Sequence, residues 1–193
     1  MATDLDVLQV AASTCVRCGL ADTRTQVVFG SGRPHADLLL LGEAPGADED
    51  RLGQPFVGRS GQLLVRLLGE ELGLGRDDVY IANIAKCRPP DNRNPTRAEA
   101  ESCRPWLDGQ LDAVAPRVVV TFGNVPTQAM LGIRDGITKV RGSTYTVDGR
   151  RVVPTLHPAY VLRGGAAPMA LLRTDLQRAG AELSAARSQA ATG

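Results

Sequence analysis

The 193-residue sequence predicts an α/β fold, with a three-layer α/β/α sandwich around a central, mainly parallel four-stranded sheet. The first observation behind this prediction is that short apolar, β-branched runs alternate with helical patterns, which is typical of βαβ units. The second is the length, which suits one compact domain because single hydrophobic cores keep growing well beyond this size. We therefore expect residues 1–193 to form a single domain.

Four runs of largely apolar residues are the expected strands: DLLLL at 37–41, VYIANIA at 79–85, RVVVTF at 117–122 and VVPTL at 152–156. Helical patterns at 62–72, 97–114 and 125–131 separate them, and a C-terminal helix with a flexible, Ala/Ser/Gly-rich tail is expected over about 166–193. The helix at 97–114 has the clearest start. Thr96 can cap it, and Glu99, three residues later, completes a capping box.

Composition narrows the classes of protein that the chain can belong to. The net charge is +1 and 22% of residues are charged, so a nucleic-acid partner would have to meet a local positive surface. The sequence has no cationic-plus-apolar leader, and no apolar run approaches the ~20 residues of a membrane span. We expect a soluble, intracellular protein of the cytoplasm that acts as a monomer.

Unusual chemistry follows each of the four expected strands. The first ends in GEAPG, the second contains Asn83 and leads into KCRPP, the third ends in TFGN, and the fourth ends in LHPAY. Ligands of open parallel sheets bind in the crevice beyond the carboxyl ends of the strands. These segments therefore predict a binding site at one edge of the sheet.

The four cysteines predict a metal centre. Cys15 and Cys18 form a C-x2-C pair, and Cys87 and Cys103 are distant single thiols. Disulfides are disfavoured in an intracellular protein, and idle buried thiols are the alternative that requires no ligand. From the residues alone, zinc and an iron–sulfur cluster are both compatible with four thiolates. Either metal would pin the N-terminal segment to the region 87–103, so we expect a structural role.

Several long segments resemble the family-four uracil-DNA glycosylases, which are DNA-repair enzymes with a four-iron four-sulfur cluster. The segments, in order, are GEAPGADEDRLGQPFVGRSG, ANIAKCRPPDNRNPT, VVVTFGN and LHPAYVLR, and the match runs from about Cys15 to Arg163. The resemblance implies that the chain flips uracil out of DNA and hydrolyses its N-glycosidic bond, releasing free uracil and leaving an abasic site. It also favours a [4Fe-4S] cluster over zinc at the four cysteines.

The resemblance assigns the uracil-binding residues. Gly42, Glu43 and Ala44, after the first strand, let the backbone approach the flipped base. Phe56 would stack on the pyrimidine ring, although an aromatic ring in this glycine-flanked loop could instead cover the core. Asn83 offers an acceptor and a donor that match N3–H and O4 of uracil but not the corresponding groups of cytosine; the alternative is an asparagine that caps a turn.

His157 is expected to donate a hydrogen bond to uracil O2, where negative charge grows as the glycosidic bond breaks. A lone histidine before proline is otherwise more often structural, and His35, in a GRPH loop, has no expected role.

Water activation is assigned to an acidic residue of the first loop. The best-studied uracil glycosylases begin this loop GQDPY, with an aspartate that positions water and a tyrosine that blocks the methyl group of thymine. Ala44 and Gly46 occupy those positions here. Glu43 is the catalytic candidate for stabilising the sugar cation or orienting water, and Glu49 and Asp50 are alternatives. A solvated acidic loop with no catalytic role is a further interpretation.

DNA contacts are expected around the same crevice. Arg59, Ser60 and Gly61 lie where a helix N-terminus can bind phosphate. The apolar residues Tyr160, Val161 and Leu162 suit a wedge that fills the space of the flipped base, and Arg163 supplies a cation for the backbone. Lys139 and Arg141 are further phosphate candidates.

Two other functions compete with a monofunctional glycosylase. A related protein that becomes covalently trapped on DNA carries an Arg-rich insert with a nucleophilic histidine, but the corresponding loop here, RPPDNRNPT, has no histidine. The chain could also be a metal-stapled nucleic-acid or nucleotide-binding module without catalysis, because Ala44 replaces the catalytic aspartate. The joint presence of Phe56, Asn83 and His157 favours the glycosylase.

Overall fold

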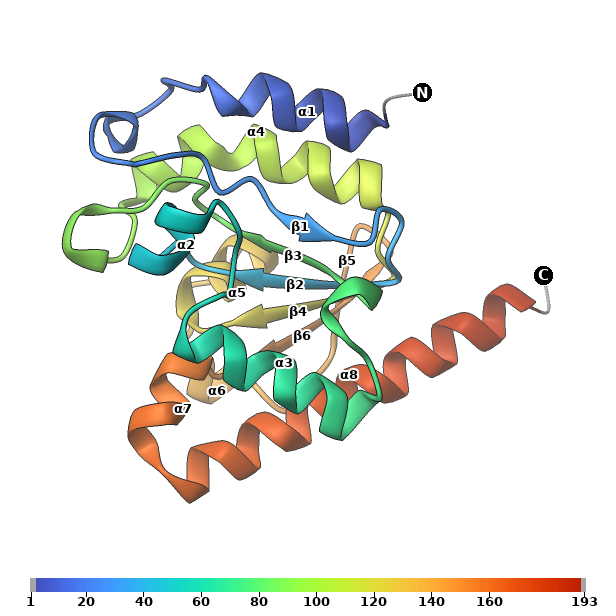
Figure 1. Cartoon of the computed structure of the whole chain (residues 1–193). Helices are drawn as coiled ribbons and strands as arrows, with labels where there is room; N and C mark the ends of the chain where they lie inside the picture. Colours follow the sequence, from blue (N-terminus) through green and yellow to red (C-terminus); the bar gives the residue numbers. More distant parts are fainter. Residues whose placement is uncertain (1–2, 192–193) are drawn as a thin grey trace.

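The structure, a computed structural model, describes the backbone of residues 3–191 and the side chains of residues 3–189. A six-stranded sheet runs through its centre in the order β1-β3-β2-β4-β6-β5 (Figure 1). The strands are β1 Ser31–Gly32, β2 Leu38–Gly42, β3 Tyr80–Asn83, β4 Val118–Phe122, β5 Tyr145–Val147 and β6 Arg150–Thr155. The predicted α/β class and mostly parallel sheet are confirmed, but the predicted number of four strands is wrong.

The two additional strands lie at the edges of the sheet and run antiparallel to their neighbours. β1 pairs with β3, and β5 pairs with β6. β5 and β6 form a hairpin around Asp148 and Gly149, whose φ angles of 49° and 77° suit a type I′ turn. The Asp-Gly pair is a strong hairpin signal, so β5 could have been predicted. β1 has only two residues and no comparable signal.

The four parallel strands are buried on both faces, except at Arg150 and Arg151 at the start of β6, as their apolar runs predict. Neighbouring side chains point to opposite faces, so Leu38 and Leu40 join one core cluster while Leu39 and Leu41 join another. Figure 1 shows α1 and α4 against one face and α3 and α8 against the other. The helices are α1 Asp4–Ser13, α2 Ala47–Leu52, α3 Arg59–Leu72, α4 Arg97–Val114, α5 Asn124–Leu131, α6 Ile137–Val140, α7 Pro158–Gly164 and α8 Ala166–Ala191.

The predicted helices are all present, and α4 has the predicted bounds. The capping box is also confirmed, since Glu99 N–H donates to Thr96 Oγ1 (3.2 Å) and Thr96 N–H donates to the Glu99 carboxylate (2.7 Å). α8 continues to Ala191, so the predicted tail is helical up to that residue and its last two residues lie outside the described part. Within residues 3–191, no helix combines the length and hydropathy needed to cross a bilayer.

The strand order places a topological switch point between β2 and β4. After β2 the chain adds β3 on one side, and it then adds β4 on the other. Ligand sites of open α/β sheets lie at such points, beyond the carboxyl ends of the strands. The pairing of β2 with the β3 segment continues there, because Ile84 N–H donates to Gly42 O (2.9 Å) and Ala85 N–H to Glu43 O (3.0 Å). Glu43 and Asn83 are thereby brought to the same edge.

Candidate active site and cysteine centre

A cavity of about 520 Å³ opens at this carboxyl edge, a volume typical of small-molecule sites. The predicted site residues that line it are Glu43, Ala44, Phe56, Ser60, Asn83, His157, Tyr160 and Arg163. Gly42, Arg59 and Leu162 do not line it. Gly42 lies directly behind the wall, where a Cβ atom would come within 2.3 Å of Asn83 Oδ1 and 2.6 Å of the Phe56 ring. Only glycine fits between these two side chains.

Asn83 ends β3 with its side chain at the cavity wall. The residue is 2% exposed, and its amide makes no hydrogen bond to any other residue within the part of the chain whose side chains are described. The amide atoms are not among the sealed side-chain atoms that lack a partner in the described residues, so they are open to the cavity. The turn-capping alternative would need a hydrogen bond to another residue. The amide is free to pair with a ligand in the cavity.

Phe56 belongs both to the core and to the cavity wall. Its ring centroid lies 5.8 Å from that of Phe122 in the core and 6.0 Å from that of His157, with which it is stacked at an interplanar angle of 27°. The stacking and core-covering interpretations are therefore compatible. Its backbone has a φ of 54°, a left-handed conformation that is unfavourable for a bulky residue.

The side chain of Arg76 and the absence of one at Gly61 allow this backbone conformation. Arg76 donates to the carbonyl oxygens of Pro55 and Phe56, at 3.1 Å from the latter, and to Ser31 Oγ (3.0 Å). A Cβ atom at Gly61 would lie 1.9 Å from Phe56 O, so glycine is required where helix α3 passes under the loop. The sequence offers no signal for Arg76, which lies twenty residues after the ring that it supports.

Glu49 organises the other side of the loop. One carboxylate oxygen accepts from the N–H groups of Val57 (3.0 Å) and Gly58 (2.9 Å), and the other accepts from Gly46 N–H (3.1 Å). Glu49 lines the cavity, but both of its oxygens are already used by the backbone. Asp50 does not line it. Its buried carboxylate accepts from Thr25 N–H (3.0 Å).

Glu43 is a half-buried carboxyl group at the cavity, and burial raises its pKa. None of the hydrogen bonds or ion pairs among the described side chains involves its carboxylate. Ala44, beside it, lines the cavity and also packs against a small cluster that contains Leu20, Ala85 and Cys87. Glu43 is therefore the carboxylate of this loop that remains available to a ligand.

His157 has one structural and one available nitrogen. Nδ1 accepts from Ala159 N–H (3.1 Å) and caps helix α7, so the proton of the neutral ring resides on Nε2. Burial lowers the pKa of His157 to about 4, with the positive charge of Arg163 acting in the same direction and Glu49 opposing it. At neutral pH the imidazole is uncharged, and its Nε2–H group is available for donation.

The predicted DNA-contacting residues lie around the mouth. Tyr160 and Leu162 project from α7 and are 52% and 42% exposed, while Arg163 and Ser60 line the cavity. Arg59, the first residue of α3, is exposed outside it. The inclusion of Val161 in the wedge is wrong: the residue is 1% exposed and packs in the core.

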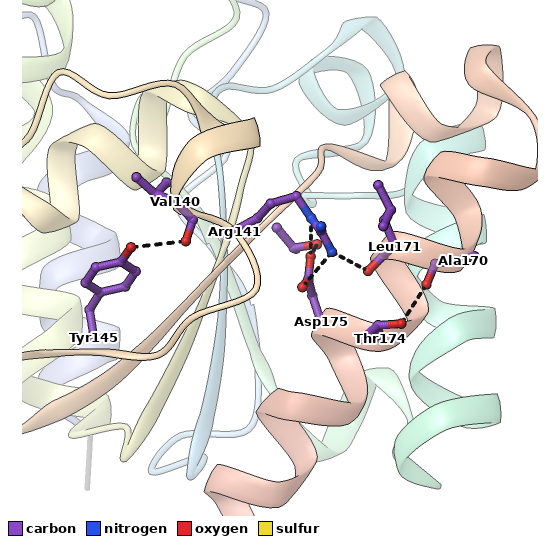
Figure 2. A network of polar contacts seen from close by, with 8 residues as sticks. Val140, Arg141, Tyr145, Ala170, Leu171, Thr174 and Asp175 are labelled. Carbon is purple, nitrogen blue, oxygen red and sulfur yellow. Dashed lines mark hydrogen bonds and ion pairs between the residues drawn. The ribbon is translucent and has the colours of Figure 1, made fainter.

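The assignment of Arg141 to phosphate binding is also wrong. Figure 2 shows its guanidinium group turned towards Asp175, to which it donates at 2.9 and 3.0 Å, and towards the carbonyl oxygen of Leu171 (3.1 Å). Asp175 is fully buried and also accepts from Thr155 Oγ1 (2.7 Å), so Arg141 connects the segment after α6 to α8. Lys139 is exposed and pairs with Asp135.

The cavity has a further wall that the sequence interpretation omitted, formed by Asn92, Arg93 and Asn94 of the loop between β3 and α4. Asp91 and Asn92 both have positive φ angles (54° and 53°). Asp and Asn tolerate this conformation, and their succession was the available signal for a tight turn.

The four cysteines line one hollow, together with Arg24, Lys86 and Trp106, and all four thiols are free. Three sulfurs accept N–H bonds at 3.3 Å: Cys87 from Arg24, Cys103 from the Lys86 backbone and Cys15 from Trp106. Burial raises the pKa of the Cys87 and Cys103 thiols. Among the described side chains, no three of the ligand types converge closely enough to enclose a metal ion.

Lys86 lies between this hollow and the cavity. It is 1% exposed, and its ammonium group donates to Asn83 O (2.7 Å) and to Gln110 Oε1 (2.5 Å). Burial lowers the pKa of Lys86 to about 8, whereas the neighbouring Cys103 and Cys87 raise it. No carboxylate pairs with Lys86 anywhere in residues 3–189. Sequence patterns alone do not predict a buried lysine of this kind.

Comparison with known proteins places this geometry in context. Residues 29–177 match the model of the uracil DNA glycosylase superfamily. The chain is 42% identical over 166 residues to a type-4 uracil-DNA glycosylase of Sulfurisphaera tokodaii, covering 82% of this chain and 76% of the relative. It is 42% identical over 161 residues to the type-4 enzyme of Thermotoga maritima (82% and 83%) and 36% identical over 143 residues to a type-5 enzyme of Thermus thermophilus (64% of each).

Proposed function

The chain belongs to the uracil-DNA glycosylase superfamily and is a type-4 enzyme, a hydrolase that removes uracil from DNA in base excision repair, and we propose that Phe56, Asn83 and His157 carry this activity. The observation that supports the proposal is the cavity wall itself. It combines an aromatic face, an unpartnered amide and an imidazole N–H donor at the carboxyl edge of one sheet.

Recognition of uracil follows from the amide of Asn83. The base must leave the duplex to reach a cavity of this kind, and Phe56 offers it a stacking surface. Asn83 Oδ1 then accepts from uracil N3–H, and Nδ2 donates to O4. Cytosine presents an acceptor at N3 and an amino group at C4, so both pairings fail as long as the amide keeps this orientation. Because the Asn83 amide has no hydrogen-bond partner within the described side chains, it breaks no existing hydrogen bond when it pairs with the base.

Bond cleavage leaves negative charge on the uracil ring and positive charge on the sugar. His157 Nε2–H donates towards O2 of the departing base, and a neutral donor of this kind does not release a proton when the charge develops. Glu43 faces the cation as a carboxylate, or orients the water that attacks it. Glu49 instead holds the loop, because its oxygens are already bonded to the backbone.

The proposed DNA-binding surface surrounds the mouth of the cavity. Backbone N–H groups of Arg59 and Ser60 lie in the first turn of α3, where no helical carbonyl precedes them, and can bind a phosphate. Tyr160 and Leu162 are exposed apolar side chains that can occupy the space left by the flipped nucleotide, and Arg163 adds a positive charge beside them.

We propose that Cys15, Cys18, Cys87 and Cys103 hold a [4Fe-4S] cluster. The chemistry of the donor set supports the proposal, because four free thiols line one hollow and three of their sulfurs already accept N–H bonds, although among the described side chains no three of them lie close enough together to enclose a metal ion. The buried cation of Lys86 adds a second reason, since a charge without a counter-ion costs several kcal/mol in the interior and no carboxylate within the described residues offsets it. When bound, the cluster supplies negative charge and a cross-link between distant segments.

The base-reading role of Asn83 is tested by replacing it with aspartate. Asn83→Asp offers acceptors only, so it can take the cytosine amino group but loses the donor to uracil O4. We expect uracil release from DNA to fall by about 10–100-fold and the preference for uracil over cytosine to narrow, because each lost or mismatched polar contact costs about 1–3 kcal/mol. Single-turnover release of labelled uracil and cytosine from otherwise identical duplexes measures both effects. Unchanged discrimination would place the base reader elsewhere.

Two substitutions in the first loop test water activation. Glu43→Gln removes a carboxylate at the cavity and is expected to slow release by about 10²–10⁴-fold, the range typical of general-base effects. Ala44→Asp adds a carboxylate and is expected to accelerate uracil release at neutral pH. The gain is limited because residue 44 packs against the small cluster that contains Leu20, Ala85 and Cys87. Single-turnover rates at pH 7 compare the two. An inactive Ala44→Asp together with a normal Glu43→Gln would place the attacking water elsewhere.

A further inference from the structure

Lys86 is the buried residue that touches both centres of the molecule. Its side chain donates to the carbonyl oxygen of Asn83, at the uracil cavity, while its backbone N–H donates to Cys103 Sγ, in the cysteine hollow. Lys86 therefore lies three residues after Asn83, the proposed base reader, and its backbone N–H group is bonded to Cys103, a proposed cluster ligand. Above, the charge of Lys86 serves only as support for the proposed cluster, and no role in uracil recognition is assigned to this side chain.

The other anchor of the ammonium group is itself fixed. Gln110, fully buried on α4, donates from Nε2 to Phe29 O (2.8 Å) and to Tyr80 Oη (3.1 Å). These two bonds set the orientation of the amide, so Oε1 is the end that faces Lys86. The ammonium is thus held at one fixed point relative to helix α4, and it holds the Asn83 carbonyl from there.

The side chain of Asn83 has no such support of its own. Its amide makes no hydrogen bond to other residues within the described side chains, so its position depends on its backbone and on packing against Gly42 and Phe56. β3 ends at Asn83, and the chain beyond it leads into the cysteine hollow. A base reader must hold its donor and acceptor within a few tenths of an ångström of the productive geometry, and buried neighbours usually provide this.

We propose that Lys86 is a positioning residue for uracil recognition, which fixes the Asn83 backbone from the cysteine centre so that the amide meets the base. The inference rests on the proposed role of Asn83 as base reader. It makes recognition of the base depend on the cysteine hollow through one side chain, rather than through the overall stability of the fold.

A double-mutant cycle between Lys86→Met and Asn83→Ala tests this coupling. Methionine keeps the length of the buried side chain and removes the ammonium group, and Asn83→Ala removes the amide while keeping the carbonyl. We expect Lys86→Met alone to slow uracil release at least tenfold. In the Asn83→Ala background the same change is expected to add less than twofold, because Lys86 has no amide left to position.

Binding gives a readout that does not depend on turnover. The probe is a duplex with 2′-fluoro-2′-deoxyuridine, which resists hydrolysis, and the reference is the same duplex with a tetrahydrofuran abasic analogue. Lys86→Met is expected to weaken binding of the uracil analogue by at least tenfold and to leave binding of the abasic analogue within twofold. An equal loss for both duplexes would overturn the inference.

Arg24→Met is the matched control, because Arg24 also donates to Cys87 Sγ and Cys15 O but does not contact Asn83. In the Arg24→Met, Asn83→Ala double variant, the fold-loss in the rate of uracil release is expected to equal the product of the two single losses, as for independent sites. If the Lys86→Met loss multiplies in the same way, Lys86 acts only on the fold and the proposal is wrong. A near-normal Asn83→Ala would instead refute the proposed base reader.

Should Lys86→Met fail to fold, Gln110→Met provides the second variant. It leaves the lysine in place but removes the acceptor that fixes it. The proposal then requires a loss of uracil-analogue binding that disappears in the Asn83→Ala background, and a loss that persists there would contradict it.

Discussion

Replacing His157 with asparagine is expected to slow uracil release roughly 10²–10³-fold, the effect typical of removing one hydrogen-bond donor to a developing anion. The imidazole reaches the cavity with Nε2–H while Nδ1 caps α7 through Ala159 N–H. Asparagine is a favourable N-cap residue and can keep the second function, but its shorter side chain withdraws the donor from the cavity. Single-turnover release at saturating enzyme measures the loss.

His157→Leu is the control for the capping role, because it removes both the donor and the cap. Its free energy of unfolding is expected to fall about 1 kcal/mol below that of His157→Asn, while both variants lose activity to a similar extent. If His157→Asn retained wild-type rates, the donor to O2 would have to come from another residue.

The same side chain gives a pH signature. Its folded pKa of about 4 lies below its ordinary value of 6.5, so the unfolded chain binds more protons between these two values. The stability associated with the neutral ring is complete above pH 6.5 and is lost as the pH falls towards 4. The slope of unfolding free energy against pH in this window should therefore be smaller in His157→Asn. Activity should show no inflection from His157 between pH 6 and 8.

Removing one of the buried cysteines is expected to destabilise the folded enzyme strongly. The purified protein should be brown and bind about four irons, and Cys103→Ala should lose the colour and unfold cooperatively at much lower temperature. The reason is that the cysteines lie on α4, on the segment after β3 and in the N-terminal region, so the proposed cluster would tie these segments together when bound. Iron analysis, visible absorption and thermal unfolding measure the result.

Asn83→Ala serves as the matched control for this prediction, since it disables the proposed base reader without touching a sulfur atom. It should keep its iron and its colour while losing uracil release. A colourless wild-type protein that holds one tightly bound zinc would contradict the cluster, and a Cys103→Ala variant with normal stability would contradict its structural role.

The central strands and α4 were predictable because their signals are local. The runs at 38–41 and 118–122 are buried on both faces. Thr96 and Glu99, three residues apart, form the capping box that predicts the start of α4. α1 was missed because Val7 and Val10 are exposed on it, which obscures the apolar periodicity. α2 is acidic and only six residues long, so its place depends on contacts made by the carboxylate of Asp50 with a distant segment.

The residues of the candidate site also fall into two groups, those that local sequence signals predict and those that only the folded chain reveals. Asn83 and His157 end or follow strands in recognisable segments, and the structure brings both to the cavity. Arg76 and Lys86 could not be found from sequence, because their partners lie in backbone carbonyls that only the folded chain brings near. Lysine and arginine are usually solvated, and Arg141, assigned to DNA, is likewise held by a buried carboxylate.

The left-handed backbone of Phe56 is strained, and the packing of its own ring offsets that strain. A non-glycine residue in this conformation costs about 1–2 kcal/mol, and Arg76 and Glu49 hold the loop in place regardless. Glycine would relieve the strain without disturbing those bonds, but it would also remove a ring that is 6% exposed and packs against Phe122, and truncating a buried phenylalanine costs about 3–5 kcal/mol. Selection for heat resistance alone would therefore keep the ring, so stability and the proposed stacking surface for the base favour the same residue at this position.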